Sequence, residues 1–169
     1  KLRYVAITDH AQHLGIVHGL DAVMAVLGGE ASPGSSRDAA EVWIVENVSA
    51  GGFGAVVPQA KADWLQIGAL LAMQPDGGNN WVVGMVRRVS KTGQAARVGI
   101  QTLSRSAELA RFSLRGTEQP GVLLPAAGLG IGETSIALRA GVFEPGRNLE
   151  SERAGRSYVY LPQSVSERG

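Results

Sequence analysis

The chain of 169 residues contains no cysteine. Disulfide bonds, thiolate catalysis and zinc sites built on cysteine ligands are therefore excluded. No apolar run approaches the roughly 20 residues that a membrane-spanning helix needs, so we expect no membrane span. Neither sign of charge dominates, because 16 basic residues nearly balance 15 acidic ones. This balance argues against binding of a nucleic acid polymer through overall charge and leaves room for a local anion site.

The sequence begins at Lys1 and not at a methionine. It also shows no recognisable signal peptide. We expect it to be a fragment of a longer protein, from which upstream residues, including any targeting segment, have been lost. A chain without cysteine is compatible with a reducing compartment, and the predicted location is the cytoplasm.

The composition predicts a folded protein rich in turns. Hydrophobic residues make up 44% of the chain and charged residues 18%, which is typical of globular proteins. The 23 glycines and 7 prolines indicate many turns, which favours an all-β architecture over a helical bundle.

One segment has helical rather than strand spacing. In Gly19–Leu27, the residues Leu20, Val23, Met24 and Leu27 follow an i, i+3, i+4, i+7 pattern and predict a short helix with one apolar face. The glycine pair that follows provides a stop. We expect Met24 to fill the core.

Short apolar segments separated by turn residues predict the strands. The first half has them at Lys1–Thr8, Leu14–Val17, Trp43–Val45, Ala55–Val57, Ala69–Gln74, and in a hairpin formed by Trp81–Ser90 and Ala96–Leu103. The second half has them at Ala110–Leu114, Gly121–Leu124, Glu133–Arg139 and Arg156–Leu161. The segment Arg147–Arg156 is polar and charged, and we place no strand in it. Two domains are predicted, 1–106 and 107–169.

A glycine-rich turn between two apolar strands is the most informative stretch. Asn47-Val48-Ser49-Ala50-Gly51-Gly52 fits the pattern Asp/Asn-x-Ser-x-x-Gly. The two polar side chains suit bonds to local backbone or to a ligand, and glycines let a ligand or strand approach the main chain. The residues alone favour a structural turn, in which Asn and Ser bond local backbone, over a ligand site.

This motif resembles the signature of PilZ domains. The resemblance spans roughly Leu14–Ser104, because WVVGMVRRVS and ARVGIQTL are similar to later strands of the family. It implies that the first predicted domain, 1–106, is a six-stranded β-barrel with an N-terminal extension. The one or two short helices and the second small β-domain follow from the residue pattern, which leaves open an independent barrel or extra strands on the first. The resemblance also implies that Asn47, Ser49 and Gly52 contact cyclic di-GMP.

The sequence departs from the family at the other half of its signature. The Arg-x-x-x-Arg pair expected before the first barrel strand is absent upstream of Asn47, where Arg3 and Arg37 stand alone. Guanidinium groups suit phosphates and guanine edges, whereas a neutral imidazole such as that of His10 substitutes poorly. Arg37 and Arg88 are the candidates for anion contact in their place.

The pair Arg87-Arg88 lies within a predicted strand, together with Arg97 on the returning strand. Strict alternation places one arginine of the pair on each face of the barrel. The plain interpretation of all three is a solvated surface, and the functional one is a basic rim near the turn.

Two hypotheses of different classes follow. The first is a cyclic di-GMP receptor module in bacterial second-messenger signalling. The second is a degenerate PilZ-like domain that binds no nucleotide and acts through a protein partner, for example in motility. The sequence does not reveal the oligomeric state. No nucleophile–base–acid pattern or metal-ligand set is present, and the spacing of His10, His13 and His18 suits no metal site, so we predict neither an enzyme nor a cofactor.

Overall fold

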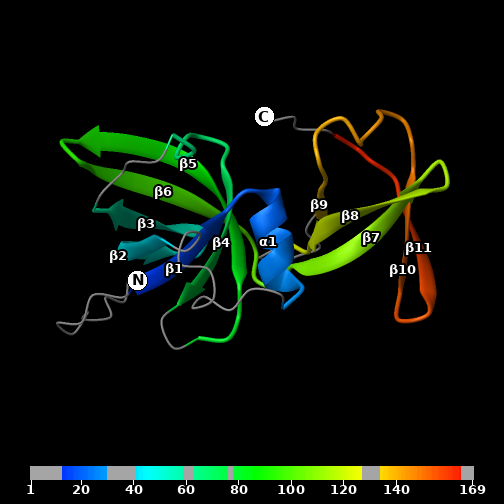
Figure 1. Cartoon of the computed structure of the whole chain (residues 1–169), viewed down its shortest axis with the longest axis horizontal. Coiled ribbons are helices and arrows are strands. Elements are labelled where there is room, and N and C mark those ends of the chain that lie inside the picture. Colours follow the sequence, from blue (N-terminus) through cyan, green and yellow to red (C-terminus); the bar gives the residue numbers. More distant parts are fainter. Residues whose placement is uncertain (1–12, 30–40, 59–62, 76–77, 127–133, 165–169) are drawn as a thin grey trace.

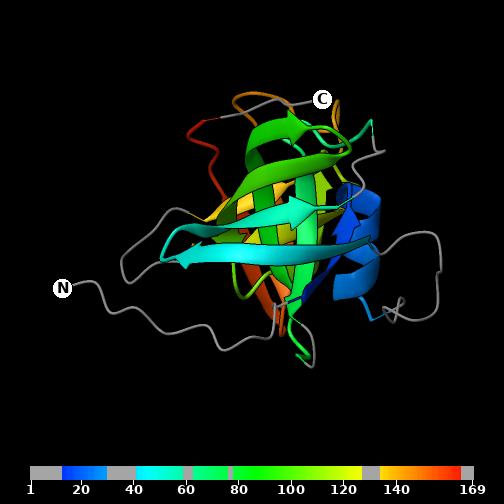
Figure 2. The ribbon, with the colours of Figure 1, turned by 90° about the vertical axis from the view of Figure 1, so that its left-hand side faces the viewer.

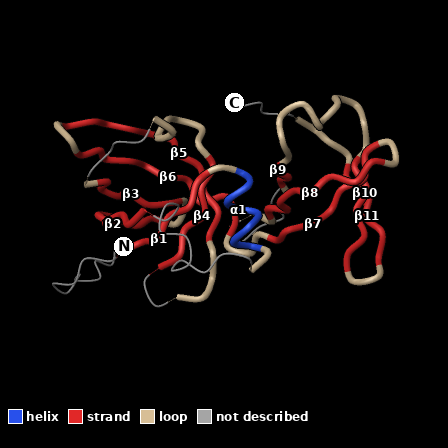
Figure 3. Tube along the Cα trace, in the orientation of Figure 1, coloured by secondary structure: helices blue, strands red, loops and turns tan. Residues whose placement is uncertain are grey.

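The computed structural model describes residues 13–29, 41–58, 63–75, 78–126 and 134–164. In these ranges the chain forms a closed barrel of six antiparallel strands, an open sheet of five strands, and one short helix between them (Figure 1, Figure 3). The prediction of an all-β protein with a six-stranded barrel is confirmed. None of the described helical structure is long and apolar enough to cross a membrane. The predicted strand Lys1–Thr8 lies outside the described residues.

The barrel strands pair in the order β1-β2-β3-β6-β5-β4 and then close on β1. Their bounds are β1 His13–His18, β2 Glu41–Ser49, β3 Gly52–Val57, β4 Leu70–Pro75, β5 Val82–Thr92 and β6 Ala95–Ser104. Alternate residues of each strand point inward, as a pleated strand requires. In β6, for example, Ala96, Val98 and Ile100 are buried while Arg97 and Gln101 are exposed.

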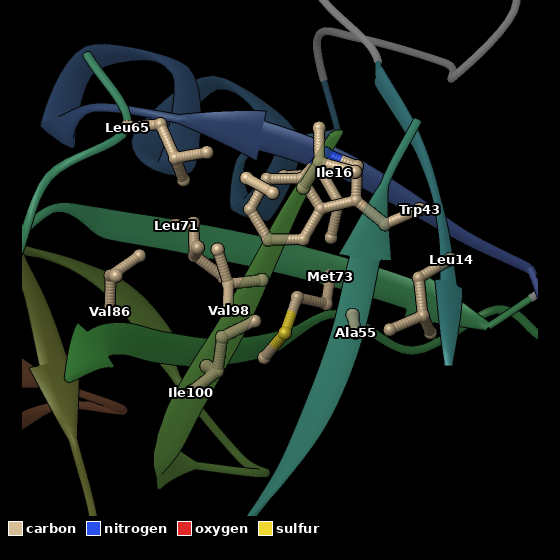
Figure 4. Packing of buried hydrophobic residues seen from close by; sticks show 12 residues of the cluster. Leu14, Ile16, Trp43, Ala55, Leu65, Leu71, Met73, Val86, Val98 and Ile100 are labelled. Atoms are coloured by element: carbon tan, nitrogen blue, oxygen red, sulfur yellow. The ribbon is translucent and has the colours of Figure 1, made fainter. Parts of the chain in front are cut away.

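The barrel is filled by one apolar cluster centred on Trp43 (Figure 4). The indole of Trp43 is fully buried and lies beside Ile16 and Met73 in the view of Figure 4. Burying an aromatic side chain of this size contributes strongly to the free energy of folding.

The rings of His18, Trp64 and Trp43 form a stack. The ring of His18 stacks on Trp64 with centroids 4.0 Å apart, and Trp64 lies parallel to Trp43 with centroids 5.8 Å apart. Both indole N–H groups donate to the carboxylate of Glu41, at 3.0 Å from Trp43 and 3.3 Å from Trp64. The polar atoms of the buried tryptophan are thereby satisfied.

The helix α1, Leu20–Leu27, lies between the barrel and the second sheet (Figure 1). Its Val23, Met24 and Val26 belong to one buried cluster with Val83 of β5 and Val122 of the second sheet. The helical spacing seen in the sequence thus predicted the element and two of its buried residues, Val23 and Met24. The predicted Leu20 and Leu27 are partly buried, and the buried Val26 was not predicted. The helix joins the two sheets through apolar contacts.

The second sheet has the strand order β11-β10-β7-β8-β9. Its strands are β7 Glu108–Leu114, β8 Thr117–Leu124, β9 Ser135–Ala137, β10 Leu149–Arg153 and β11 Arg156–Tyr160. Strand β10 corrects the prediction for Arg147–Arg156, because Leu149 and Ser151 are buried and alternate with exposed glutamates. The alternation is that of a strand, although only one of these inward residues is apolar. The division into domains after residue 106 remains a prediction.

Candidate ligand-binding surface

Asn47 and Ser49 lie at the end of β2 and Gly52 begins β3, and the two polar side chains bond across the hairpin that these strands form. The amide N–H of Gly54 donates to Oδ1 of Asn47 at 3.1 Å. The hydroxyl of Ser49 donates to the carbonyl oxygen of Gly52 at 3.1 Å. Both side chains are exposed, so they keep donor and acceptor capacity facing solvent. The turn role expected of Asn and Ser is therefore confirmed, and it leaves room for ligand contact.

Gly52 is buried against the backbone of β6. A Cβ built at this position would lie 1.9 Å from the carbonyl oxygen of Ile100 on β6. Real side chains do not tolerate such an approach, so only glycine allows β3 to pair with β6 here. The third motif position is thus required by the packing of the barrel itself.

Four residues on four neighbouring strands form a row across the outer face of the barrel. Asn47 of β2 pairs with Gly54 of β3, Gly54 pairs with Gly99 of β6, and Gly99 pairs with Arg88 of β5. Paired residues point to the same face of a sheet. The row therefore has a polar side chain at each end and two glycines between them. We call Gly54 and Gly99 the glycine floor.

The end residues of the row lean over the glycines next to them. The position that a Cβ of Gly54 would occupy is 2.8 Å from Oδ1 of Asn47. The corresponding position at Gly99 is 3.4 Å from Nε of Arg88. A larger residue at Gly54 would displace the amide, and one at Gly99 would crowd the guanidinium, so the floor sets the positions of both side chains.

Arg87 and Arg88 both lie on the outer surface, which corrects the expectation of one arginine on each face. The register between β5 and β6 shifts between Val86 and Arg88. A bulge of this kind places an extra residue on one strand and re-aims its side chain. Arg87 donates through Nε to Oε1 of Gln101 at 2.7 Å, on the outer face of β6. Arg88 lies beside it, over Gly99.

A second bulge lies on the opposite side of the floor. The register between β2 and β3 shifts between Val45 and Asn47, which makes Glu46 the extra residue. The carboxylate of Glu46 reaches Arg97 of β6 at 3.3 Å, with the Arg97 side chain 74% exposed. Such an exposed ion pair stabilises the fold by little, about 0–1 kcal/mol. It does hold Arg97 near the edge of the glycine floor.

This surface lies on the side of the barrel away from the second sheet. The helix α1 packs against β1 and β4, which lie opposite β3 and β6 in the barrel order. In Figure 2 the hairpin of β2 and β3 faces the viewer and the second sheet lies behind the barrel. The described part of the chain leaves the surface open.

The structure brings most of the predicted site residues together. Asn47, Ser49 and Gly52 share the hairpin, and Arg88 lies across the floor from Asn47. Arg37 lies outside the described residues. Sequence reasoning missed Glu46 and Gln101, because each depends on a bulge or on cross-strand pairing that single-strand alternation does not reveal.

The missing Arg-x-x-x-Arg spacing occurs later in the chain, at Arg111 and Arg115. Both belong to the β7–β8 hairpin of the second sheet. Arg111 pairs with Glu118 at 3.7 Å and Arg115 with Glu144 at 2.7 Å. These arginines are engaged elsewhere and do not belong to the surface around the glycine floor.

Comparison with known proteins identifies the barrel. Residues 29–108 match a family model described as "Cyclic-di-GMP receptor FimW, middle PilZ domain". The match covers strands β2 to β6, with β1 and α1 preceding it. Searches of curated proteins and of solved structures returned no significant match. The Asn-x-Ser-x-x-Gly hairpin, the closed six-stranded barrel and the family match agree, and the resemblance of this barrel to PilZ domains is therefore confirmed.

Proposed function

We propose that this chain is a receptor module that binds cyclic di-GMP on the outer face of its barrel. Asn47 and Ser49 orient the ligand, and Gly52 keeps the hairpin close to β6. Arg88 supplies a guanidinium from across the glycine floor, and Arg37 is a further predicted contact. The match to the PilZ domain of a cyclic di-GMP receptor supports the ligand class.

The proposal rests mainly on the motif hairpin, which presents the side chains of Asn47 and Ser49 at the outer surface of the barrel. Asn47 and Ser49 are exposed, yet each is fixed by one hydrogen bond to the backbone of β3. A side chain held in place before binding loses less conformational entropy when the ligand arrives. The hairpin therefore presents oriented polar groups beside a flat glycine surface, where a planar base can lie against the backbone.

In this proposal the chain acts without catalysis or a cofactor, in the cytoplasm of a bacterium. Its output passes to a protein partner, and control of motility is one candidate output. The route from the ligand to the partner is a shift between the barrel and the second sheet. The helix α1 supports this route, because it packs on both.

Isothermal titration of the full chain with cyclic di-GMP tests the proposal. The double variant Asn47→Ala/Ser49→Ala should weaken binding by about tenfold or more, since two hydrogen-bonding side chains are lost. Its melting temperature should fall only by about 2–8 °C, because each exposed bond contributes about 1 kcal/mol. Ser157→Ala on the exposed face of β11 is the matched control and should bind like the original protein.

A double variant that keeps its fold and binds with unchanged affinity would remove these residues from the site. If the original protein gives no heat and no thermal shift even at high concentrations of cyclic di-GMP, the second function is favoured instead. That function is a PilZ domain that binds no nucleotide and contacts a protein partner. The absence of an Arg-x-x-x-Arg pair upstream of Asn47 is the observation in its favour.

A further inference from the structure

The face of the barrel around the glycine floor is rich in arginine. Arg87 and Arg88 come from the bulge of β5, and Arg97 comes from β6. All three side chains are exposed on the outer surface. We call Arg87, Arg88 and Arg97 the arginine face. Among the described residues, the one carboxylate that pairs with it is that of Glu46.

The three guanidinium groups differ in what they already contact. Arg87 bonds a neutral amide oxygen of Gln101 at 2.7 Å, and Arg97 pairs with Glu46 at 3.3 Å. In the described residues, no carboxylate or hydrogen-bond acceptor is found for Arg88, whose Nε lies over Gly99. Arg88 thus keeps its full donor fork for an anion, and Arg97 is held by a group that an anion can displace.

We propose that the arginine face is a phosphate-binding site carried by strands. Its arginines bind the phosphodiester groups of cyclic di-GMP, a role that arginines from a loop before the barrel would otherwise have. Arg88 is the principal contact, Arg87 and Arg97 flank it, and Glu46 competes with the phosphates for Arg97. This inference rests on the proposed function, because it names the groups that hold the anionic part of the same ligand.

Geometry and charge support this assignment. Arg88 and Asn47 end the same cross-strand row, three strand spacings apart, which corresponds to about 14 Å at 4.7–4.9 Å per spacing. The floor between them has no side chain beyond Cα, so a ligand can span it while touching both ends. Among the described residues, three guanidinium groups against one carboxylate leave the face with a net positive charge of two, 3 − 1. An anion is attracted there although the whole chain is nearly neutral.

Glutamine substitutions test the arginine face while keeping much of each side chain's length. Titration of the full chain with cyclic di-GMP should show that Arg88→Gln weakens binding by about tenfold or more, since a charge-assisted contact is lost. Arg87→Gln and Arg97→Gln should each weaken it severalfold. The triple variant should also lose most of the salt dependence of the affinity. Arg111→Gln, an exposed arginine of the second sheet that pairs with Glu118, is the matched control and should bind normally.

Glu46→Gln provides a test that loss of folding cannot imitate. Removing the competing carboxylate should tighten binding severalfold, and the effect should disappear when Arg97 is also glutamine. Arg88→Lys should fall between the original residue and glutamine, because lysine keeps the charge and loses the bidentate geometry.

Two failures are distinguishable. If the original protein binds and the triple variant binds equally well with the same salt dependence, the arginine face is overturned and the proposed function stands. If the original protein does not bind cyclic di-GMP at all, the proposed function fails and the arginine face fails with it.

Discussion

The barrel and the second sheet differ in how their strands are completed. Every barrel strand is paired on both sides, since β1 pairs with both β2 and β4. In the part of the chain that is described, the second sheet is open, with β11 and β9 at its two edges. Closure removes unpaired backbone groups, whereas an open edge presents them to solvent.

Their cores differ as well. Among the described residues, the barrel interior contains a cluster of twelve buried apolar residues, whereas the cluster that belongs to the second sheet alone contains four. A further eight described residues are shared through α1, β1, β4, β5 and β8. The barrel therefore has a core of its own, and the second sheet depends on the surface that it shares with the barrel. Each prediction below tests this contrast or the special position of the motif hairpin.

The largest effect is expected from truncating the central aromatic residue of each core. Trp43→Ala and Phe112→Ala each remove a fully buried ring and should lower the free energy of unfolding by about 3–5 kcal/mol. Hydrogen exchange should then separate them. Trp43→Ala should reduce protection throughout the chain, whereas Phe112→Ala should reduce it in β7 to β11 and spare β2, β3 and β6. Equal loss everywhere in both variants would argue for one cooperative unit and against two domains.

Gly52→Ala should rank next, with a loss of about 3 kcal/mol. The new methyl group would lie within 1.9 Å of the carbonyl oxygen of Ile100, and backbone cannot yield as a flexible side chain does. Gly51→Ala is the matched control, because a Cβ there meets nothing within 4 Å. Thermal unfolding of the two variants checks the difference. Similar melting temperatures would mean that β3 and β6 are not held as closely as described.

Leu124→Ala acts on the shared cluster and should cost about 2 kcal/mol. Because Leu124 of β8 belongs to the same cluster as Ala72 of β4, the loss of protection should extend to β4 as well as to β8. Chemical denaturation gives the size of the effect, and hydrogen exchange gives its extent. Exchange that changes only in the second sheet would show that α1 does not couple the two sheets.

Val159→Lys on β11 should have the smallest effect on stability, within about 0.5 kcal/mol, because the side chain is 58% exposed. It should still reduce self-association at high protein concentration, since a charge on an edge strand opposes pairing with another strand. Light scattering measures this property. Unchanged scattering, in a protein that does associate, would show that β11 is not the edge involved.

The elements with a clear period could be predicted from the sequence. The i, i+3, i+4, i+7 spacing from Leu20 to Leu27 predicted α1, and the Trp81–Ser90 and Ala96–Leu103 pair predicted the β5–β6 hairpin. Both depend on the local spacing of apolar residues, which can be read directly from the sequence. The hairpin with Asn47 and Ser49 was found in another way, through turn residues at fixed positions that resemble the PilZ signature.

The parts that sequence reasoning missed depend on partners far along the chain. Arg87 faces outward because β5 gains a residue opposite β6, and no feature of VVGMVRRVS alone shows that shift. Strand β10 escaped because Glu150 and Glu152 lie on its exposed face, so its composition is that of a loop. The pairing of Glu46 with Arg97 likewise exists only after β2, β3 and β6 are side by side.

The position of α1 has a consequence for how this protein tolerates mutation over evolutionary time. Val23, Met24 and Val26 are confined between the barrel and the second sheet, so a change of volume at any of them disturbs two surfaces at once. Side chains on the exposed faces of the strands contact water and can change with little effect on the free energy of unfolding. Among homologues that keep both sheets, this short helix should therefore drift more slowly in sequence than the exposed strand positions around it.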